Sequence, residues 1–247
     1  MPKICFLADA SSPHTVKWVS GCADLHWEII VISHWPGEVP GAKVIVHPLS
    51  LTGFPRYCWS LRRLVRGFKP DIIHAHQLGA HALYAWFCGI TPLVITAWGS
   101  DVLVKPKHSW LIRRLVKFLI PKAALLTSDS AQINNQLIAY GAKPGQILTL
   151  LFGLNQQRYQ ELALATKDAT RVIICSPRLH EPIYNIEEII KAFCQLHLEQ
   201  PQLELWLLGS GSLTAKLQQI VTDSALSASI RFWGRVTPTE FSKYLAA

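Results

Sequence analysis

The chain has 247 residues, half of them hydrophobic and 16% charged, with a formal net charge of +8. This balance excludes a disordered chain, and the length suits one large domain or two modest ones. Six scattered cysteines form no C-x-x-C pair and no Cys/His ligand spacing. We therefore expect no zinc site and no disulfide scaffold, but buried free thiols in a reducing, cytoplasmic compartment. No segment resembles a secretory leader or a membrane span.

Short apolar runs alternate with helix-like segments through the first 151 residues. The predicted strands are 4–8, 27–33, 44–47, 72–75, 93–97, 124–128 and 147–151. The predicted helices are 15–22, 59–68, 79–87, 109–120 and 131–139. This alternation predicts an α/β fold with a parallel, doubly wound sheet, in which ligands bind beyond the carboxyl ends of the strands. The segments that follow those ends are therefore the places to look for a site: 9–14, 74–79, 98–101, 128–130 and 152–155.

The alternation stops and then restarts in the second half of the chain. Residues 156–170 have the composition of a linker. The expected elements beyond it are strands at 171–175, 203–208 and 230–233, and helices at 185–198, 213–222 and from Pro238 onward. Because three strands are few for a doubly wound sheet, we expect a complete Rossmann-like domain at 1–155, a linker, and an incomplete second domain at 171–247.

The positive charge is concentrated in the first half. Residues 1–122 carry 14 basic and 6 acidic side chains, whereas residues 123–247 carry ten of each. Two segments, 56–69 and 105–122, contain no acid at all. As helices they would present basic faces opposite apolar ones, the basic residues being Arg62, Arg63, Arg66, Arg113, Arg114 and Lys117, and the apolar ones Leu61, Leu64, Val65, Phe68, Leu111, Leu115, Phe118 and Leu119.

Two interpretations of these basic faces stay open. They are either ordinary solvated helix surfaces or a surface that meets polyanions or the anionic lipid headgroups of the inner membrane face. Nucleic acid is not an expected partner, because the sequence has no recognition-helix motif, RNA-binding signature or zinc finger.

A series of short motifs, in a fixed order, resembles one known family. The motifs are Asp71-Ile-Ile-His-Ala-His76, Pro92-Leu-Val-Ile-Thr-Ala-Trp-Gly-Ser-Asp101, Leu125-Leu-Thr-Ser-Asp-Ser130, Gly153-Leu-Asn155, Ser176-Pro-Arg-Leu179, Ile189-Ile-Lys-Ala-Phe193, Leu207-Leu-Gly-Ser-Gly211 and Phe232-Trp-Gly-Arg-Val236. The series is similar to that of glycosyltransferase family 4, retaining sugar transferases of the GT-B fold. The resemblance implies two Rossmann-like domains, the first for the acceptor and the second for a nucleotide-sugar donor.

The resemblance places the donor in the second domain. Fixed cations and backbone N–H groups can stabilise a diphosphate leaving group in place of a metal. We therefore expect no metal or other cofactor. Arg178 matches the family's arginine, and its alternative role is an ion pair with Glu181 or another acid. Tyr184 stands where the family usually has a lysine, so it can hydrogen-bond a phosphate but not neutralise it. Gly209, Gly211 and Val236 complete the predicted donor site, although Gly209-Ser-Gly211 is equally consistent with an ordinary strand-to-helix turn.

The first domain would hold a lipid-linked or glycan acceptor. The predicted acceptor-binding residues are Ser12, His14, Trp98 and Ser100, with Trp98 standing where many family members have a histidine. Asp101 and His76 are the predicted catalytic residues, because a carboxylate or imidazole can hold or deprotonate a hydroxyl. Their alternatives are structural: Asp101 can cap the helix that follows, and a lone histidine is often a buried hydrogen-bonding group.

Two hypotheses of function follow. The first is a hexosyltransferase-type enzyme that moves a sugar, with retention and without metal, from a nucleotide sugar to a lipid-linked or polysaccharide acceptor. The second is a non-catalytic remnant or split half that binds a membrane surface or a partner chain. The second is kept because the family's Glu-x7-Glu segment would lie beyond residue 247, so we expect this chain to be incomplete. An NAD-dependent enzyme is a distant third, because no Gly-x-Gly-x-x-Gly follows the first strand.

Overall fold

The computed structural model describes residues 1–48, 54–151, 153 and 172–246. The chain divides into two compact units, Met1–Gly153 and Leu154–Ala247. The predicted linker at 156–170 lies outside the described residues.

Unit 1 is built on a seven-stranded, wholly parallel sheet in the order β3-β2-β1-β4-β5-β6-β7. The strands are β1 (Lys3–Leu7), β2 (Glu28–Ser33), β3 (Lys43–Val46), β4 (Ile72–His76), β5 (Leu93–Thr96), β6 (Leu125–Ser128) and β7 (Ile147–Thr149). β1 lies between β2 and β4, with Cys5 paired to Ile30 of β2 and to Ile73 of β4. The predicted α/β class and its doubly wound parallel sheet are confirmed.

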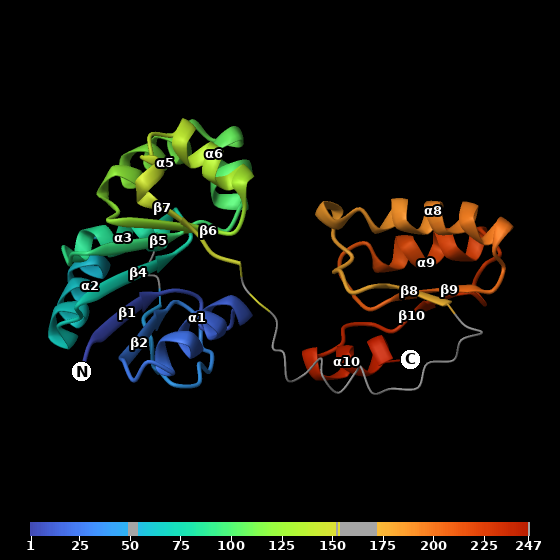
Figure 1. Ribbon diagram of the computed structural model, residues 1–247, viewed down its shortest axis with the longest axis horizontal. Coiled ribbons are helices and arrows are strands. Elements are labelled where there is room, and N and C mark those ends of the chain that lie inside the picture. Colours follow the sequence, from blue (N-terminus) through green and yellow to red (C-terminus); the bar gives the residue numbers. More distant parts are fainter. Residues whose placement is uncertain (49–53, 152, 154–171, 247) are drawn as a thin grey trace. The chain divides into compact units, whose positions relative to one another are not determined.

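Helices cover this sheet on both faces (Figure 1). They are α1 (Pro13–Ala23), α2 (Phe54–Phe68), α3 (Ala80–Cys88), α4 (Lys105–His108), α5 (Trp110–Leu119) and α6 (Ala131–Ala139). The apolar sides of α2, α3, α5 and α6 join one hydrophobic core with β1, β2, β4, β5 and β6. The other core lies under α1, where Val19 packs on Phe6 and Val31. Continuous apolar strands are what burial on both faces requires.

Two features of unit 1 differ from the sequence prediction. α2 begins at Phe54, five residues before the predicted start at Trp59, and Pro55 stands in its first turn, where a missing N–H costs no hydrogen bond. The predicted helix at 109–120 is preceded by a turn of π-helix, η1 (Ser100–Val104), and by α4. Neither has an apolar periodicity of its own, so the sequence did not indicate them.

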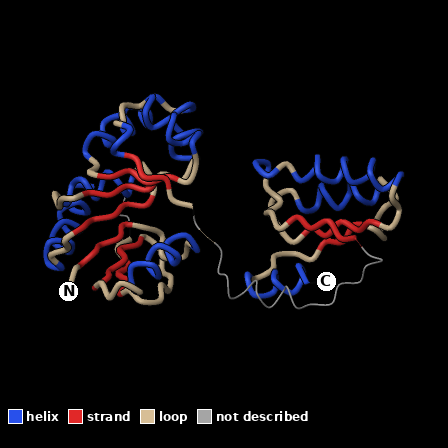
Figure 2. Tube along the Cα trace, viewed as in Figure 1, coloured by secondary structure: helices blue, strands red, loops and turns tan. Residues whose placement is uncertain are grey.

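Unit 2 contains a three-stranded parallel sheet in the order β10-β9-β8. Its elements are β8 (Val172–Ser176), α8 (Ile186–Glu199), β9 (Leu203–Leu207), α9 (Thr214–Asp223), β10 (Ile230–Phe232) and α10 (Pro238–Ala246). Figure 2 shows α8 and α9 on one side of the strands and α10 on the other. Ile190 of α8, Leu205 of β9 and Leu217 of α9 form the fully buried centre of its core.

The six cysteines are free thiols. Cys5 and Cys88 are buried, as expected, but the other four are only half-buried. Among the described residues no helix is both long and apolar enough to cross a membrane.

Candidate functional site

A pocket of about 150 Å³ lies at the carboxyl edge of the unit 1 sheet. It sits where the strand order reverses, because β1 is followed in the sheet by β2 on one side and β4 on the other. At such a point the chain runs from one strand to one face of the sheet and from the neighbouring strand to the opposite face. The segments that follow the two strands therefore diverge, and a crevice forms between them. The pocket is lined by Asp9, Ser12, His14, Thr15, His76, Gln77, His81 and Trp98. We call it the β1/β4 pocket.

His76 ends β4 and is 3% exposed. Its Nδ1 atom lies 3.4 Å from the hydroxyl of Thr15, while its Nε2 atom has no hydrogen-bond partner among the described residues. Burial, and then the neighbouring histidines, hold the pKa of His76 well below its usual value. The ring is therefore neutral near pH 7, and Nε2 is a buried polar atom whose hydrogen-bonding capacity the described residues leave unused.

His14 and Trp98 form an aromatic wall of the same pocket. Their ring centroids are 4.5 Å apart, and the indole of Trp98 meets the ring of His76 edge-on at 5.6 Å. Burial and the charge of Lys17 lower the pKa of His14, against the opposing effect of Asp129. The structure thus brings together His14, His76 and Trp98, which lie in three segments far apart in the sequence.

Asp101 is buried beside the pocket but does not line it. It is 2% exposed, and its two carboxylate oxygens accept backbone N–H bonds from Leu78 (2.7 Å) and Trp98 (3.0 Å). These bonds tie the segment after β4 to the segment after β5. The geometry gives Asp101 the role of positioning Trp98. It does not cap the helix that follows, because η1 has no side-chain cap hydrogen bond.

The two predicted serines have different surroundings. Ser12 lines the pocket and precedes α1 without a side-chain cap hydrogen bond. Ser100 is exposed, begins η1 and is not among the residues that line the pocket.

Four other lining residues were absent from the predicted site: Asp9, Thr15, Gln77 and His81. Asp9 accepts hydrogen bonds from the backbone and hydroxyl of Ser11, which shapes the loop after β1. His81 bonds the carbonyl of His76 through Nδ1, and burial lowers its pKa to about 4. Gln77, with a φ of 78°, turns the chain sharply after β4. For Asp9 and Gln77 the available signal was their position soon after β1 and β4, whereas Thr15 and His81 lie within α1 and α3.

In unit 2 the predicted donor residues gather after β8 and β9. Arg178 is exposed, and its guanidinium lies 5.6 Å from the ring centroid of Tyr184. The alternative ion pair with Glu181 is not formed, because the Glu181 carboxylate instead accepts from the backbone (2.9 Å) and hydroxyl (2.6 Å) of Ser212. These hydrogen bonds lower the pKa of Glu181.

Gly209 and Gly211 are required by packing. A Cβ on Gly209 would overlap the carbonyl oxygen of Arg178, and one on Gly211 would lie 2.6 Å from the carbonyl oxygen of His180. His180 is itself fully buried, with Nδ1 3.0 Å from the hydroxyl of Thr214. The 178–181 segment and the 209–214 turn are therefore locked together.

The last predicted donor residue, Val236, is half-buried. It follows Trp233, which is 40% exposed and packs against Trp206 (5.2 Å) and Tyr244 (5.0 Å between ring centroids). Among the described residues no group of three or more His, Cys, Asp or Glu side chains could hold a metal ion.

A sequence comparison decides the family. The model of the glycosyl transferase 4-like family matches residues 3–130, more than half of the chain. The chain belongs to this family.

Solved structures share the fold of this glycosyl transferase 4-like chain. Anabaena HepE in complex with UDP and glucose is 18% identical, with a TM-score of 0.72 over 96% of this chain and 70% of its own. Sucrose-phosphate synthase from Thermosynechococcus elongatus is 15% identical, with a TM-score of 0.76 over 100% and 74%. A glycosyltransferase from Rickettsia africae is 13% identical, with a TM-score of 0.73 over 100% and 71%. The fold is thus of the GT-B glycosyltransferase type. No curated protein matches the sequence significantly.

The basic helices of this glycosyl transferase 4-like chain expose more apolar surface than predicted. In α2 the prediction is correct, since Leu61 and Val65 are buried, Leu64 and Phe68 half-buried, and the three arginines exposed. In α5 it is wrong for Leu111 (62% exposed) and Phe118 (42% exposed), which lie outside the core with the basic residues. The reason is that α5 buries only Val116 and Leu119 against unit 1.

Exposed aromatic rings lie beside cations on α2 and on α5, and these pairs, together with Trp86 of α3, are here called the basic-aromatic face. Arg63 lies over Trp59 (5.8 Å), Arg114 over Trp110 (5.9 Å) and Lys122 over Phe118 (5.6 Å). Phe118 in turn meets Trp86 of α3 edge-on at 4.9 Å. A surface of exposed indoles beneath cations is suited to the interface of an anionic bilayer.

Proposed function

We propose that this chain belongs to a retaining glycosyltransferase of hexosyltransferase type that moves a sugar from a nucleotide sugar to a lipid-linked or polysaccharide acceptor without a metal. The family assignment and the GT-B fold support the transferase class. Crystal structures of Anabaena HepE hold UDP and UDP-glucose, which supports a uridine nucleotide as the first donor to test.

The observation that carries the proposal is His76 at the β1/β4 pocket. A neutral imidazole with an unsatisfied, buried Nε2 can bind an acceptor hydroxyl without competing charge. The neighbouring His14–Trp98 wall offers an aromatic surface to the apolar face of a sugar ring. Asp101 holds that wall through its bond to the Trp98 N–H.

The donor diphosphate is assigned to unit 2. Arg178 is exposed beside Tyr184, so its planar guanidinium can bind two phosphate oxygens while the phenol donates a further hydrogen bond. In the transfer, the bond from the sugar C1 to the phosphate oxygen breaks and a bond from C1 to the acceptor oxygen forms on the same ring face. The acceptor proton goes to the departing phosphate oxygen, and Arg178 stabilises the charge that remains.

A lipid-linked acceptor would lie in a membrane, so the protein would have to bind the membrane surface to reach it. The basic-aromatic face would hold unit 1 peripherally on an anionic bilayer at the inner membrane face, through Arg62, Arg63, Arg66, Arg113, Arg114 and Lys117 and the exposed rings among them.

Calorimetric titration of the chain with UDP, GDP and ADP, first without metal and then with Mg²⁺, tests the donor assignment. We expect metal-independent binding of one nucleotide, weakened at least tenfold in Arg178→Ala because the diphosphate loses its cation. Arg231→Ala is the matched control, since this exposed arginine pairs with Glu204 at 3.3 Å, and it should bind like wild type. Absence of nucleotide binding by the folded chain would refute a functional donor site here.

A further inference from the structure

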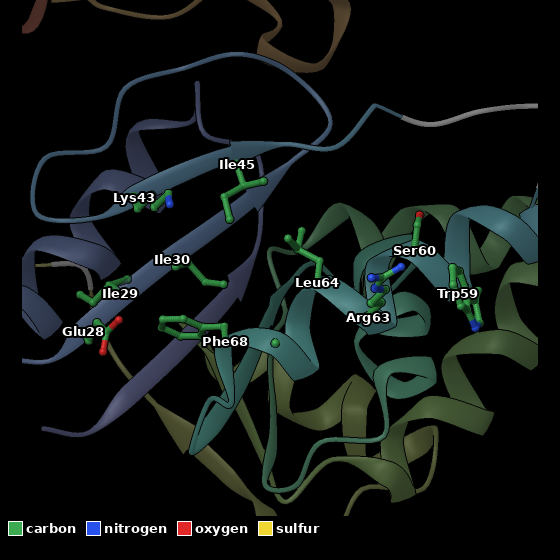
Figure 3. Close-up of a pocket in the computed structure, with 11 residues that line it drawn as sticks. Glu28, Ile29, Ile30, Lys43, Ile45, Trp59, Ser60, Arg63, Leu64 and Phe68 are labelled. Atoms are coloured by element: carbon green, nitrogen blue, oxygen red, sulfur yellow. The ribbon is translucent and has the colours of Figure 1, made fainter.

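A second and larger hollow lies on unit 1, away from the carboxyl edge. It has a volume of about 620 Å³, within the range of small-molecule sites. Figure 3 shows it between β2 and β3 on one side and α2 on the other. Its lining consists of Glu28, Ile29, Ile30, Lys43, Ile45, Trp59, Ser60, Arg63, Leu64, Gly67 and Phe68. We call it the α2 groove.

The groove exists because α2 does not fully cover the edge of the sheet. Ile45 of β3 and Leu64 and Phe68 of α2 belong to the margin of the main core and are only half-buried. Figure 3 shows Ile45 and Leu64 facing each other across the gap. Trp59 stands at the end of the groove, 64% exposed, so the groove continues into the basic-aromatic face.

The hydroxyl of Ser60 in the groove is already used by the protein. The hydroxyl of Ser60 already donates to the carbonyl of Tyr57 (2.9 Å) and lies 2.9 Å from Nε2 of His47. A hydrocarbon chain packed against Ile45, Leu64 and Phe68 needs no hydrogen-bond partner there, whereas a peptide backbone would need partners other than Ser60.

The charges at the rim favour an anion. Glu28 is paired with Lys3 at 2.9 Å. Lys43 and Arg63, by contrast, form no ion pair with an acid among the residues that the structure describes. An amphiphile with an apolar tail and an anionic head therefore complements the groove better than a neutral one.

We propose that the α2 groove binds the hydrocarbon chain of a phosphate-bearing bilayer lipid, with Arg63 on the phosphate. Arginine suits that role because its fork matches two phosphate oxygens, and Trp59 beside it is placed for the interface between headgroup and chain. The inference rests on the proposed membrane association and deepens it: the basic-aromatic face would hold the bilayer surface, and the groove would extract one chain from it.

Dodecyl phosphate, below its micelle-forming concentration, is the probe. Native mass spectrometry should show one bound molecule per chain, and calorimetry should give its affinity. We expect at least tenfold weaker binding to Leu64→Trp, whose indole fills the groove, and to Arg63→Gln, which lacks the cation. Leu148→Trp on β7, at the opposite edge of the sheet, and Arg231→Gln in unit 2 are the matched controls and should bind like wild type. Inorganic phosphate and a neutral dodecyl polyoxyethylene ether should each bind far more weakly.

Equal binding to Leu64→Trp, or equal affinity for the neutral ether, would overturn the proposal. If Leu64→Trp fails to fold by circular dichroism, Ile45→Trp fills the same gap from the β3 side. The titration with nucleoside diphosphates separates this inference from the transferase proposal. Nucleotide binding by Leu64→Trp tests the donor site alone, and lipid binding by Arg178→Ala tests the groove alone.

Discussion

The two units place their candidate residues in opposite environments. In unit 1 the β1/β4 pocket is lined mostly by uncharged side chains around the buried His76, and the pKa values of His14, His76 and His81 are all lowered by burial. In unit 2 the charged residues are exposed, and the glycine turn beneath them is fixed by close backbone packing. A neutral hydroxylated ligand suits the first environment and a diphosphate the second, because a solvated cation can meet an anion at little desolvation cost.

The largest effect on the difference between the two units is expected from a substitution at Gly209. Gly209→Ala should destabilise unit 2 by roughly 3 kcal/mol or more, because the added methyl group overlaps the backbone carbonyl of Arg178 and neither segment can move alone. Hydrogen–deuterium exchange in β9 measures the loss.

Gly21→Ala in α1 is the matched control. No atom lies within 4 Å of its Cβ position, so it should stabilise unit 1 by about 0.5–1 kcal/mol through helix propensity. Wild-type protection of β9 in Gly209→Ala would show that the two segments are not locked.

The next largest effect is expected from pH, which should lower the stability of unit 1 through the buried His74. Burial lowers the pKa of His74 to about 3. The folded state therefore binds fewer protons than the unfolded state below pH 6.5, and stability falls as the pH falls from there toward the folded pKa. Between pH 6.5 and pH 5 this one histidine should cost unit 1 about 2 kcal/mol.

The measurement is amide exchange in β4 at pH 7 and pH 5, corrected for the intrinsic rate. In wild type the side chain of His74 is hydrogen-bonded to Thr96 at 2.7 Å. A glutamine in place of His74 cannot titrate but keeps a partner for Thr96. The loss of stability on acidification should therefore be smaller in His74→Gln than in wild type. The exposed His108→Gln should behave as wild type. An equal pH effect in all three chains would remove His74 from the explanation.

The smallest effect is expected on the surface of unit 2. Lys191 pairs with Glu187 (3.0 Å) and Glu188 (2.9 Å) but is 53% exposed, so Lys191→Ala should leave the urea midpoint unchanged within error. Ile190→Ala, one residue away and fully buried, should lower stability by about 2–5 kcal/mol. A clear destabilisation by Lys191→Ala would contradict this prediction and show that exposed ion pairs contribute substantially to the stability of unit 2.

The sequence was sufficient for the order of strands and helices, because long apolar runs in an α/β chain identify buried parallel strands. It was also sufficient to put His14, His76 and Trp98 into segments that meet, since parallel strands end at one edge. It could not show that Asp101 faces inward. That depends on the π-turn that begins after Gly99, whose φ is 96°, and no periodicity indicates such a turn.

Periodicity also failed for α5. The helix is amphipathic, but which apolar residues are buried depends on how its neighbours pack, and Leu111 and Phe118 lie on the outside. The roles of Gly209 and Gly211 were open for a similar reason. A Gly-x-Gly turn looks the same whether the close neighbour is a ligand or, as here, the backbone of residues 178–181.

The uncharged histidines of the β1/β4 pocket have a consequence for the behaviour of the protein in different buffers. Although the chain carries a net charge of +8, the histidines around this pocket are uncharged near pH 7, so added salt has little to screen there. The basic-aromatic face is the reverse case, because the lipid binding proposed for it depends on solvated cations. We therefore expect added salt to weaken the proposed lipid binding while changing ligand binding at the β1/β4 pocket little.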